Sequence, residues 1–90
     1  MTDNILDQNL RETIAAVQHD IWAHWMRYQF SQCYSDARYP GSLIVPAEKV
    51  ERWTRQTNTP YSALTEGEKE SDRDQADKVL AAIEALDQDV

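Results

Sequence analysis

Ninety residues are enough for one domain with a thin hydrophobic core, and 41% hydrophobic residues exclude a disordered chain. The formal charge of −7 repels phosphate backbones and argues against nucleic-acid binding. A lone cysteine, Cys33, excludes an internal disulfide, and no apolar run is long enough to cross a membrane, so we expect a cytoplasmic protein without an anchor.

The first predicted element is a helix from about Asn9 to Phe30, a segment without glycine or proline. At 100° per residue, its apolar side chains fall on two neighbouring stripes. The first stripe comprises Leu10, Ile14, Val17, Ile21, Trp25 and Tyr28. The second stripe comprises Ala15, His19, Trp22, Met26 and Phe30. Two apolar faces exceed the need of one packing partner, so we expect this helix to contact two elements, or one element and a second subunit.

The segment that follows contains Tyr39-Pro40-Gly41, which is typical of a tight turn because proline fixes φ and glycine accepts a positive φ. The short apolar run Leu43-Ile44-Val45 fits either a brief strand or a loop.

A second helix is expected to begin at Pro46 and to end before Asn58-Thr59-Pro60. A third is expected to begin at Thr65, where Thr65 and Glu68 have the spacing of a capping box. Its apolar stripe comprises Ala76, Val79, Leu80, Ile83 and Leu86. The sequence thus predicts a mainly α fold: a compact three-helix domain over residues 1–90, with a loop or short β segment between helices 1 and 2 and flexible ends at 1–8 and 88–90.

Patterns that would indicate catalysis or cofactor binding are weak. His19 and His24 are five residues apart, which separates them by about 140° around a helix and prevents them from sharing a metal ion. The chain has only two glycines and no nucleophile elbow. We therefore expect a protein that is not an enzyme, with no metal and no cofactor.

The beginning of the third helix places charged residues on the line of its apolar stripe. Extending that stripe backwards reaches Asp72 and Lys69, with Arg73 at its edge. Either these groups face solvent because the core ends there, or they are paired, because an unpaired buried charge is costly. A paired set beside aromatic residues would form the polar floor of a small pocket.

The stretch from Pro60 to Arg73 resembles the signature of the ryanodine-receptor-type repeat, the RyR domain. That family shows a Pro-Tyr pair, a leucine three residues after the tyrosine, a Glu-Lys pair and an Asp-Arg pair. Here these positions hold Pro60-Tyr61, Leu64, Glu68-Lys69 and Asp72-Arg73. His19 and Trp22 resemble the histidine and tryptophan of the family's preceding helix. The resemblance covers residues 14–86, but the family's Gly-Trp-x-Tyr-Gly segment is absent, and Trp53 on a helix is its only substitute.

This resemblance implies a small bacterial or bacteriophage protein that binds a nucleotide-like ligand, with no catalytic residue to transfer. On this interpretation Trp22, Trp53 and Tyr61 stack on the ligand. His19, Lys69 and Arg73 supply polar contacts, and Asp72 orients Arg73. The alternative is a structural or protein-interaction domain that acts through homo-oligomerisation or a partner protein, with the wide apolar arc of the first helix as its interface.

Overall fold

The computed structural model describes residues 2–88, and it describes side chains over 8–87. Within that part the chain forms three α-helices and a two-stranded antiparallel sheet. In chain order these are α1 (Thr2–Ser31), β1 (Tyr34–Ser35), β2 (Leu43–Ile44), α2 (Ala47–Thr57), one turn of 3₁₀ helix η1 (Tyr61–Ala63) and α3 (Glu66–Gln88). The predicted mainly α architecture, with a short β segment between helices 1 and 2, is confirmed.

Helix α1 begins at Thr2, seven residues before the predicted start at Asn9. The apolar periodicity that defined the prediction starts at Leu10, whereas the backbone of residues 2–8 also adopts the helical conformation. The helix therefore covers 2–8, which were expected to form a flexible end. Residues 89 and 90 of the other expected flexible end lie outside the described residues.

The two stripes of α1 have different environments. Most members of the first stripe are half-buried, including Leu10, Val17, Ile21, Trp25 and Tyr28. The second stripe is largely open to solvent, and Trp22 and Phe30 are each 56% exposed. The helix has an internal partner for one apolar face only, so the other is available to a second molecule.

Strands β1 and β2 form a small exposed hairpin, with Tyr34 opposite Ile44 and Ser35 opposite Leu43. Its tip contains the expected turn, because the Ser42 amide donates to the Tyr39 carbonyl at 2.9 Å and Gly41 has φ of 87°. Proline followed by a glycine with positive φ is the sequence pattern of a type II turn. Leu43 and Ile44 therefore form a strand, which is one of the two structures predicted for the run Leu43-Ile44-Val45.

Helix α2 begins one residue later than predicted, with Pro46 as its N-cap, and ends at Thr57 before Asn58. Thr59 ties the end of the helix to the loop, because its Oγ1 donates to the Arg55 carbonyl at 2.6 Å. Pro60 and η1 then reverse the chain into α3.

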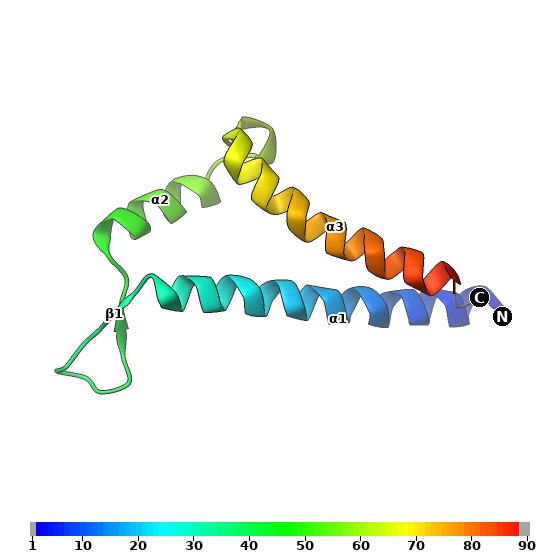
Figure 1. The fold of residues 1–90 in the computed structure, drawn as a ribbon, viewed down its shortest axis with the longest axis horizontal. Helices are drawn as coiled ribbons and strands as arrows, with labels where there is room; N and C mark the ends of the chain where they lie inside the picture. The colour runs from blue at the N-terminus through cyan, green and yellow to red at the C-terminus, as the bar shows by residue number, and fades with distance from the viewer. Residues whose placement is uncertain (1, 89–90) are drawn as a thin grey trace.

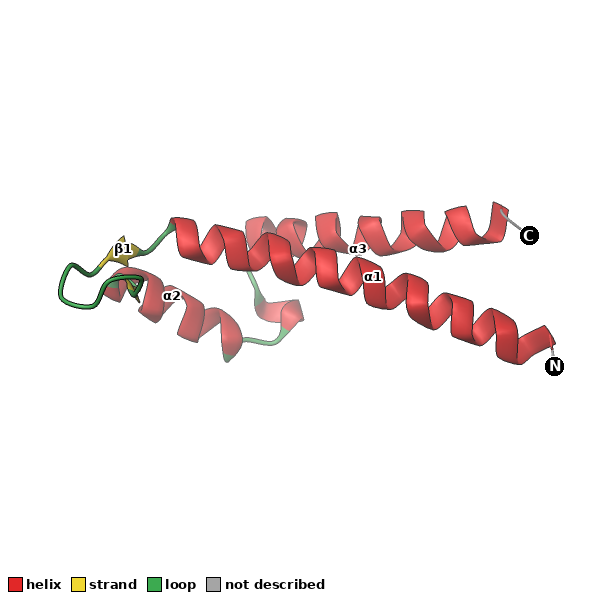
Figure 2. Ribbon diagram, turned by 90° about the horizontal axis from the view of Figure 1, so that it is seen from below, coloured by secondary structure: helices red, strands yellow, loops and turns green. Residues whose placement is uncertain are grey.

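The three helices form the sides of an open triangle (Figure 1). Helix α3 runs back towards the N-terminal half of α1, and contacts between these two helices are the main contacts between helices. Both chain ends lie at one end of the molecule, and the hairpin lies at the other (Figure 2). The radius of gyration is 17.8 Å, against about 12 Å for a compact chain of this length. The domain is elongated rather than compact, because α2 holds α1 and α3 apart at one end.

This arrangement leaves almost no interior. Of the side chains over 8–87, only Pro46 is buried, and neither the hydrophobic nor the charged residues of that range include a buried member. Within the described helices, none combines the length and the apolar character that crossing a bilayer requires.

Candidate functional site

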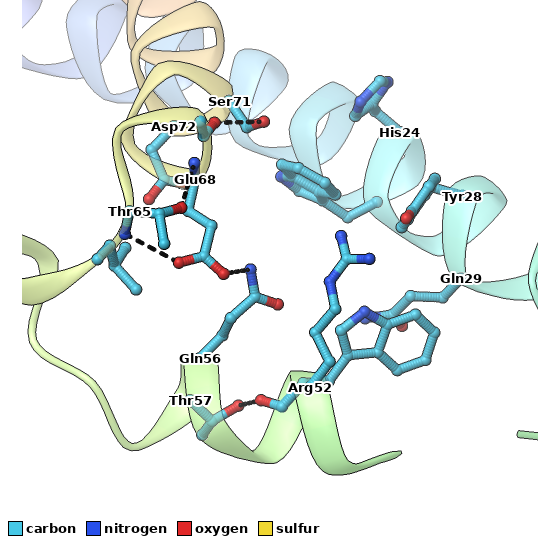
Figure 3. A pocket seen from close by; sticks show the side chains of 14 residues that line it. His24, Tyr28, Gln29, Arg52, Gln56, Thr57, Thr65, Glu68, Ser71 and Asp72 are labelled. Carbon is cyan, nitrogen blue, oxygen red and sulfur yellow. Dashed lines mark hydrogen bonds between the residues drawn. The ribbon is translucent and has the colours of Figure 1, made fainter. Parts of the chain in front are cut away.

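A hollow of about 810 Å³ lies inside the triangle, between the C-terminal half of α1, helix α2 and the beginning of α3 (Figure 3). Its volume is in the range of small-molecule pockets, although its sides are open to solvent. It is lined by His24, Trp25, Tyr28, Gln29, Arg52, Trp53, Gln56, Thr57, Leu64, Thr65, Gly67, Glu68, Ser71 and Asp72.

Aromatic rings form the wall of the hollow on the side of α1 and α2. The ring centres of Trp25 and Tyr28 are 6.1 Å apart, and those of Tyr28 and Trp53 are 6.5 Å apart, both in edge-to-face arrangements. His24 packs edge-to-face on Trp25 at 5.1 Å. These contacts join α1 to α2 and present apolar ring surface to the hollow.

The opposite wall is the first turn of α3, and its conformation is set by the predicted capping box. The Thr65 amide donates to Glu68 Oε1 at 3.0 Å, and the Glu68 amide donates to Thr65 Oγ1 at 3.2 Å. These reciprocal bonds satisfy two amides that the helix itself leaves without partners. The capping box is therefore confirmed.

The other carboxylate oxygen of Glu68 connects α3 to α2. Gln56 Nε2 donates to Glu68 Oε2 at 2.7 Å (Figure 3). Arg55 Nη2 donates to the same oxygen. The hydrogen bond from Arg55, followed by the bond from the Thr65 amide, lowers the pKa of Glu68 to about 2. The Glu68 side chain is only 14% exposed, so one carboxylate both caps α3 and holds the corner between α2 and α3.

Two further charged side chains line the hollow without an internal counter-ion. Arg52 extends from α2 into the space beside Tyr28, and Asp72 lies on the α3 side (Figure 3). Neither takes part in an ion pair with another residue of the described chain. The hollow therefore combines an aromatic wall with one cation and one anion that are free to contact a ligand.

Only two of the seven residues predicted for ligand binding, Trp53 and Asp72, line the hollow. His19 and Trp22 contact each other, with ring centres 5.8 Å apart, but they belong to the exposed second stripe and do not line it. Successive residues of a helix are rotated by 100°, so Trp22 and Trp25 lie on different faces of α1. Trp25, on the first stripe, lines the hollow in the place where Trp22 was expected.

The other three residues of that set form a separate cluster on the outside of the corner. Lys69 Nζ lies 5.9 Å from the centre of the Tyr61 ring and 3.5 Å from Glu66. Arg73 pairs with Glu66 and Glu70 at 3.3 and 3.1 Å, and the hydrogen bonds that it donates to Glu70 and then to Glu66 raise its pKa. The hydrogen bonds of Arg73 run to Glu66 and Glu70, whereas Asp72 lines the hollow, so among the described contacts Asp72 does not orient Arg73. Lys69 and Arg73 are therefore paired, whereas Asp72 faces solvent without an ion pair to another described residue, so each of the two interpretations holds for part of the set.

Sequence reasoning assigned Trp53 of the aromatic wall to the site, but not Trp25, Tyr28 or Arg52. Trp25 and Tyr28 carry the periodicity of an ordinary core face, and only the divergence of α2 from α1 turns that face into the wall of a hollow. Arg52 lies in a mixed-charge helix, where the sequence indicates a solvated face. In the described part of the chain, no group of three histidine, cysteine, aspartate or glutamate residues is arranged to hold a metal ion.

Comparison of the chain with protein-family models, with curated proteins and with solved structures finds no match.

Proposed function

We propose that this chain is a non-enzymatic structural module that completes its hydrophobic core by associating with a second copy of itself. One observation carries the proposal: among the side chains over 8–87 the only buried residue is Pro46, while large apolar groups are exposed along the whole molecule. The exposed set is Ile14, Trp22, Phe30, Tyr34, Tyr39, Leu43, Ile44, Val45, Val50, Tyr61 and Leu80.

The exposed area supports this interpretation quantitatively. The chain exposes 7201 Å², whereas a folded monomer of 10.4 kDa exposes about 5,400 Å². The excess of about 1,800 Å² is well above the roughly 800 Å² that each partner buries in a standard interface, and it matches the obligate homodimer class. Burial of apolar surface contributes about 25 cal/mol per Å², so association supplies the stabilisation that the isolated chain lacks.

Light scattering coupled to size-exclusion chromatography tests the proposal. We expect a molar mass of about twice that of the chain at micromolar concentration, together with a blue-shifted tryptophan emission that moves to the red on dilution. A helical chain that stays monomeric up to millimolar concentration would overturn the proposal. Circular dichroism on the same samples establishes that the helices are formed.

A second candidate function is the binding of a small nucleotide-like ligand, and the hollow is the specific observation that favours it. Trp25 and Trp53 offer ring faces to a base, Arg52 offers a cation to a phosphate, and Asp72 offers acceptor oxygens to amino groups. A nucleotide panel, with quenching of tryptophan fluorescence as the readout, tests this candidate. We expect Arg52→Gln to weaken binding at least tenfold and Lys49→Gln, on the same helix but outside the hollow, to leave it unchanged. Quenching that is the same for all three proteins would contradict the candidate.

Membership of the RyR family remains a proposal that rests on the spacing of Pro60-Tyr61, Glu68-Lys69 and Asp72-Arg73. The bacterial or bacteriophage setting belongs to the same proposal. A cytoplasmic location, with neither nucleic acid nor a membrane as partner, is supported by the charge of −7 and the single cysteine.

A further inference from the structure

The second stripe of α1 has the spacing of a helix–helix seam. Ala15, His19, Trp22, Met26 and Phe30 follow one another at intervals of four, three, four and four residues, close to the alternation of a two-helix interface. All are exposed except the half-buried Met26. The stripe runs along a straight helix of 30 residues, about 45 Å long, and it lies apart from the hollow.

We infer that a second copy packs its own α1 antiparallel on this seam, with Ala15 of each copy facing Met26 of the other and His19 facing Trp22. The inference rests on the self-association proposed above and adds the surface, the direction and the register. The excess accessible area argues for this occupant, because it is large enough for the interface of an obligate dimer.

The sizes of the seam residues favour the antiparallel direction. The seam begins with a small residue, Ala15, and ends with two large ones, Met26 and Phe30. In an antiparallel pair centred between residues 20 and 21, the small side chain of one copy lies level with a large one of the other. Facing positions that alternate in size fill the interface without voids. A parallel pair would oppose Trp22 to Trp22 and leave a gap at Ala15.

The charges beside the seam fit the same register. In an antiparallel pair each flank of one helix faces the same flank of the other. Glu12 then comes within reach of Arg27 of the second copy, since both lie on one flank of the seam. In a parallel pair Glu12 would face Glu12, which is unfavourable.

The shape of the chain adds a third argument. Helix α2 and the hairpin both lie at the C-terminal end of α1 (Figure 1). An antiparallel pair places these bulky parts at opposite ends of the dimer, whereas a parallel pair brings them together at one end.

Engineered cysteines test the direction and the register in a Cys33→Ser background. The variants are Ala15→Cys, Met26→Cys and the double substitution, each checked for helical content by circular dichroism. The two positions are about 16 Å apart along one helix and cannot bridge within a chain. We expect the double variant to form covalent dimers with a short bismaleimide or on mild oxidation. Each single variant stays at least tenfold less crosslinked, because its two copies of the cysteine lie about 16 Å apart across the dimer.

The outcomes separate this inference from the proposed function. Efficient crosslinking of either single variant would indicate a parallel pair and overturn the inference. A dimeric mass without crosslinking of the double variant would also overturn it, while leaving self-association in place. A monomeric mass for every variant and for the unmodified chain would remove both.

Discussion

At the scale of single residues, Glu68 is the side chain with the most roles, and its ionisation gives a testable pH dependence. Its pKa is lowered from 4.5 to about 2 in the folded chain by the bond from Arg55 and the Thr65 amide. A carboxylate with a depressed pKa stabilises the fold above its unfolded pKa, and this stabilisation is lost as the pH falls towards the folded value. We therefore expect the melting temperature to fall between pH 4.5 and pH 2, and Glu68→Gln to remove part of that fall.

Thermal melts followed by circular dichroism at pH 7, 4.5, 3 and 2 measure this effect. Glutamine keeps the capping geometry, so Glu68→Gln isolates the charge that faces Arg55. The melting temperatures of the variant and the unmodified chain should differ at pH 7 and converge at pH 2. Glu70→Gln is the matched control on the same helix, because Glu70 is 64% exposed and pairs with Arg73 of its own helix rather than with α2. A constant gap across the pH range would contradict the assigned role.

Glu68 also shows which of a residue's contacts can be predicted from the sequence and which cannot. The capping box was predicted correctly because Thr65 and Glu68 are three residues apart and the motif is local. The partnership with Arg55 spans 13 residues and depends on how η1 reverses the chain, which no local pattern encodes.

At the scale of elements, the two glycines are expected to respond to alanine in opposite directions. Gly41 has φ of 87° and open space around it, so Gly41→Ala strains the backbone without a clash. The expected cost is about 1–2 kcal/mol. We expect the Ser42 amide, which closes the turn, to exchange with solvent about 5–30-fold faster. Hydrogen exchange monitored by NMR measures this change, and unchanged exchange at Ser42 would show that the turn does not need the positive φ.

Gly67 lies in the first turn of α3, has no positive φ and has no atom within 4 Å of an added Cβ. Gly67→Ala is therefore expected to stabilise the chain by about 0.4–1 kcal/mol, because glycine loses more conformational freedom on folding than alanine does. Chemical denaturation measures the gain. A loss of stability would mean that the backbone at this position is constrained by contacts that the helix alone does not explain.

The sequence predicted the ends and the apolar faces of the helices better than it predicted which elements pack against those faces. Periodicity separated the two stripes of α1 correctly, and Pro60 and Thr65 bounded the neighbouring helices well. Periodicity identifies an apolar face without identifying what covers it. The predicted ligand residues do not share one site for this reason: periodicity does not show which face of α1 meets α2, and the position of α2 places Trp25, rather than the predicted Trp22, in the wall of the hollow.

At the scale of the whole molecule, the predicted mainly α three-helix architecture is confirmed, but the molecule is extended and not compact, and even the thin core expected from its length is missing from the described side chains. A hydrophobic fraction of 41% is sufficient for a core, yet the described residues spread over 56 × 35 × 18 Å. Composition cannot distinguish a chain that buries its own apolar residues from one that buries them against a partner. Both kinds of chain have the same content and the same helical periodicity.

If the core is completed by a second copy, unfolding and dissociation are one process, and stability depends on concentration. A tenfold increase in concentration contributes about 1.4 kcal/mol to the dimer. For the 180 residues of two copies, this corresponds to a rise of about 3–6 °C in melting temperature. Calorimetry between 5 and 500 µM measures the rise. Phe30→Asp, on the seam, is expected to flatten the dependence, whereas Tyr39→Asp at the hairpin tip should keep it, although both aromatic residues are exposed. A melting temperature independent of concentration in the unmodified chain would mean that the open triangle is stable as a monomer, and its apolar surface would then belong to a different partner.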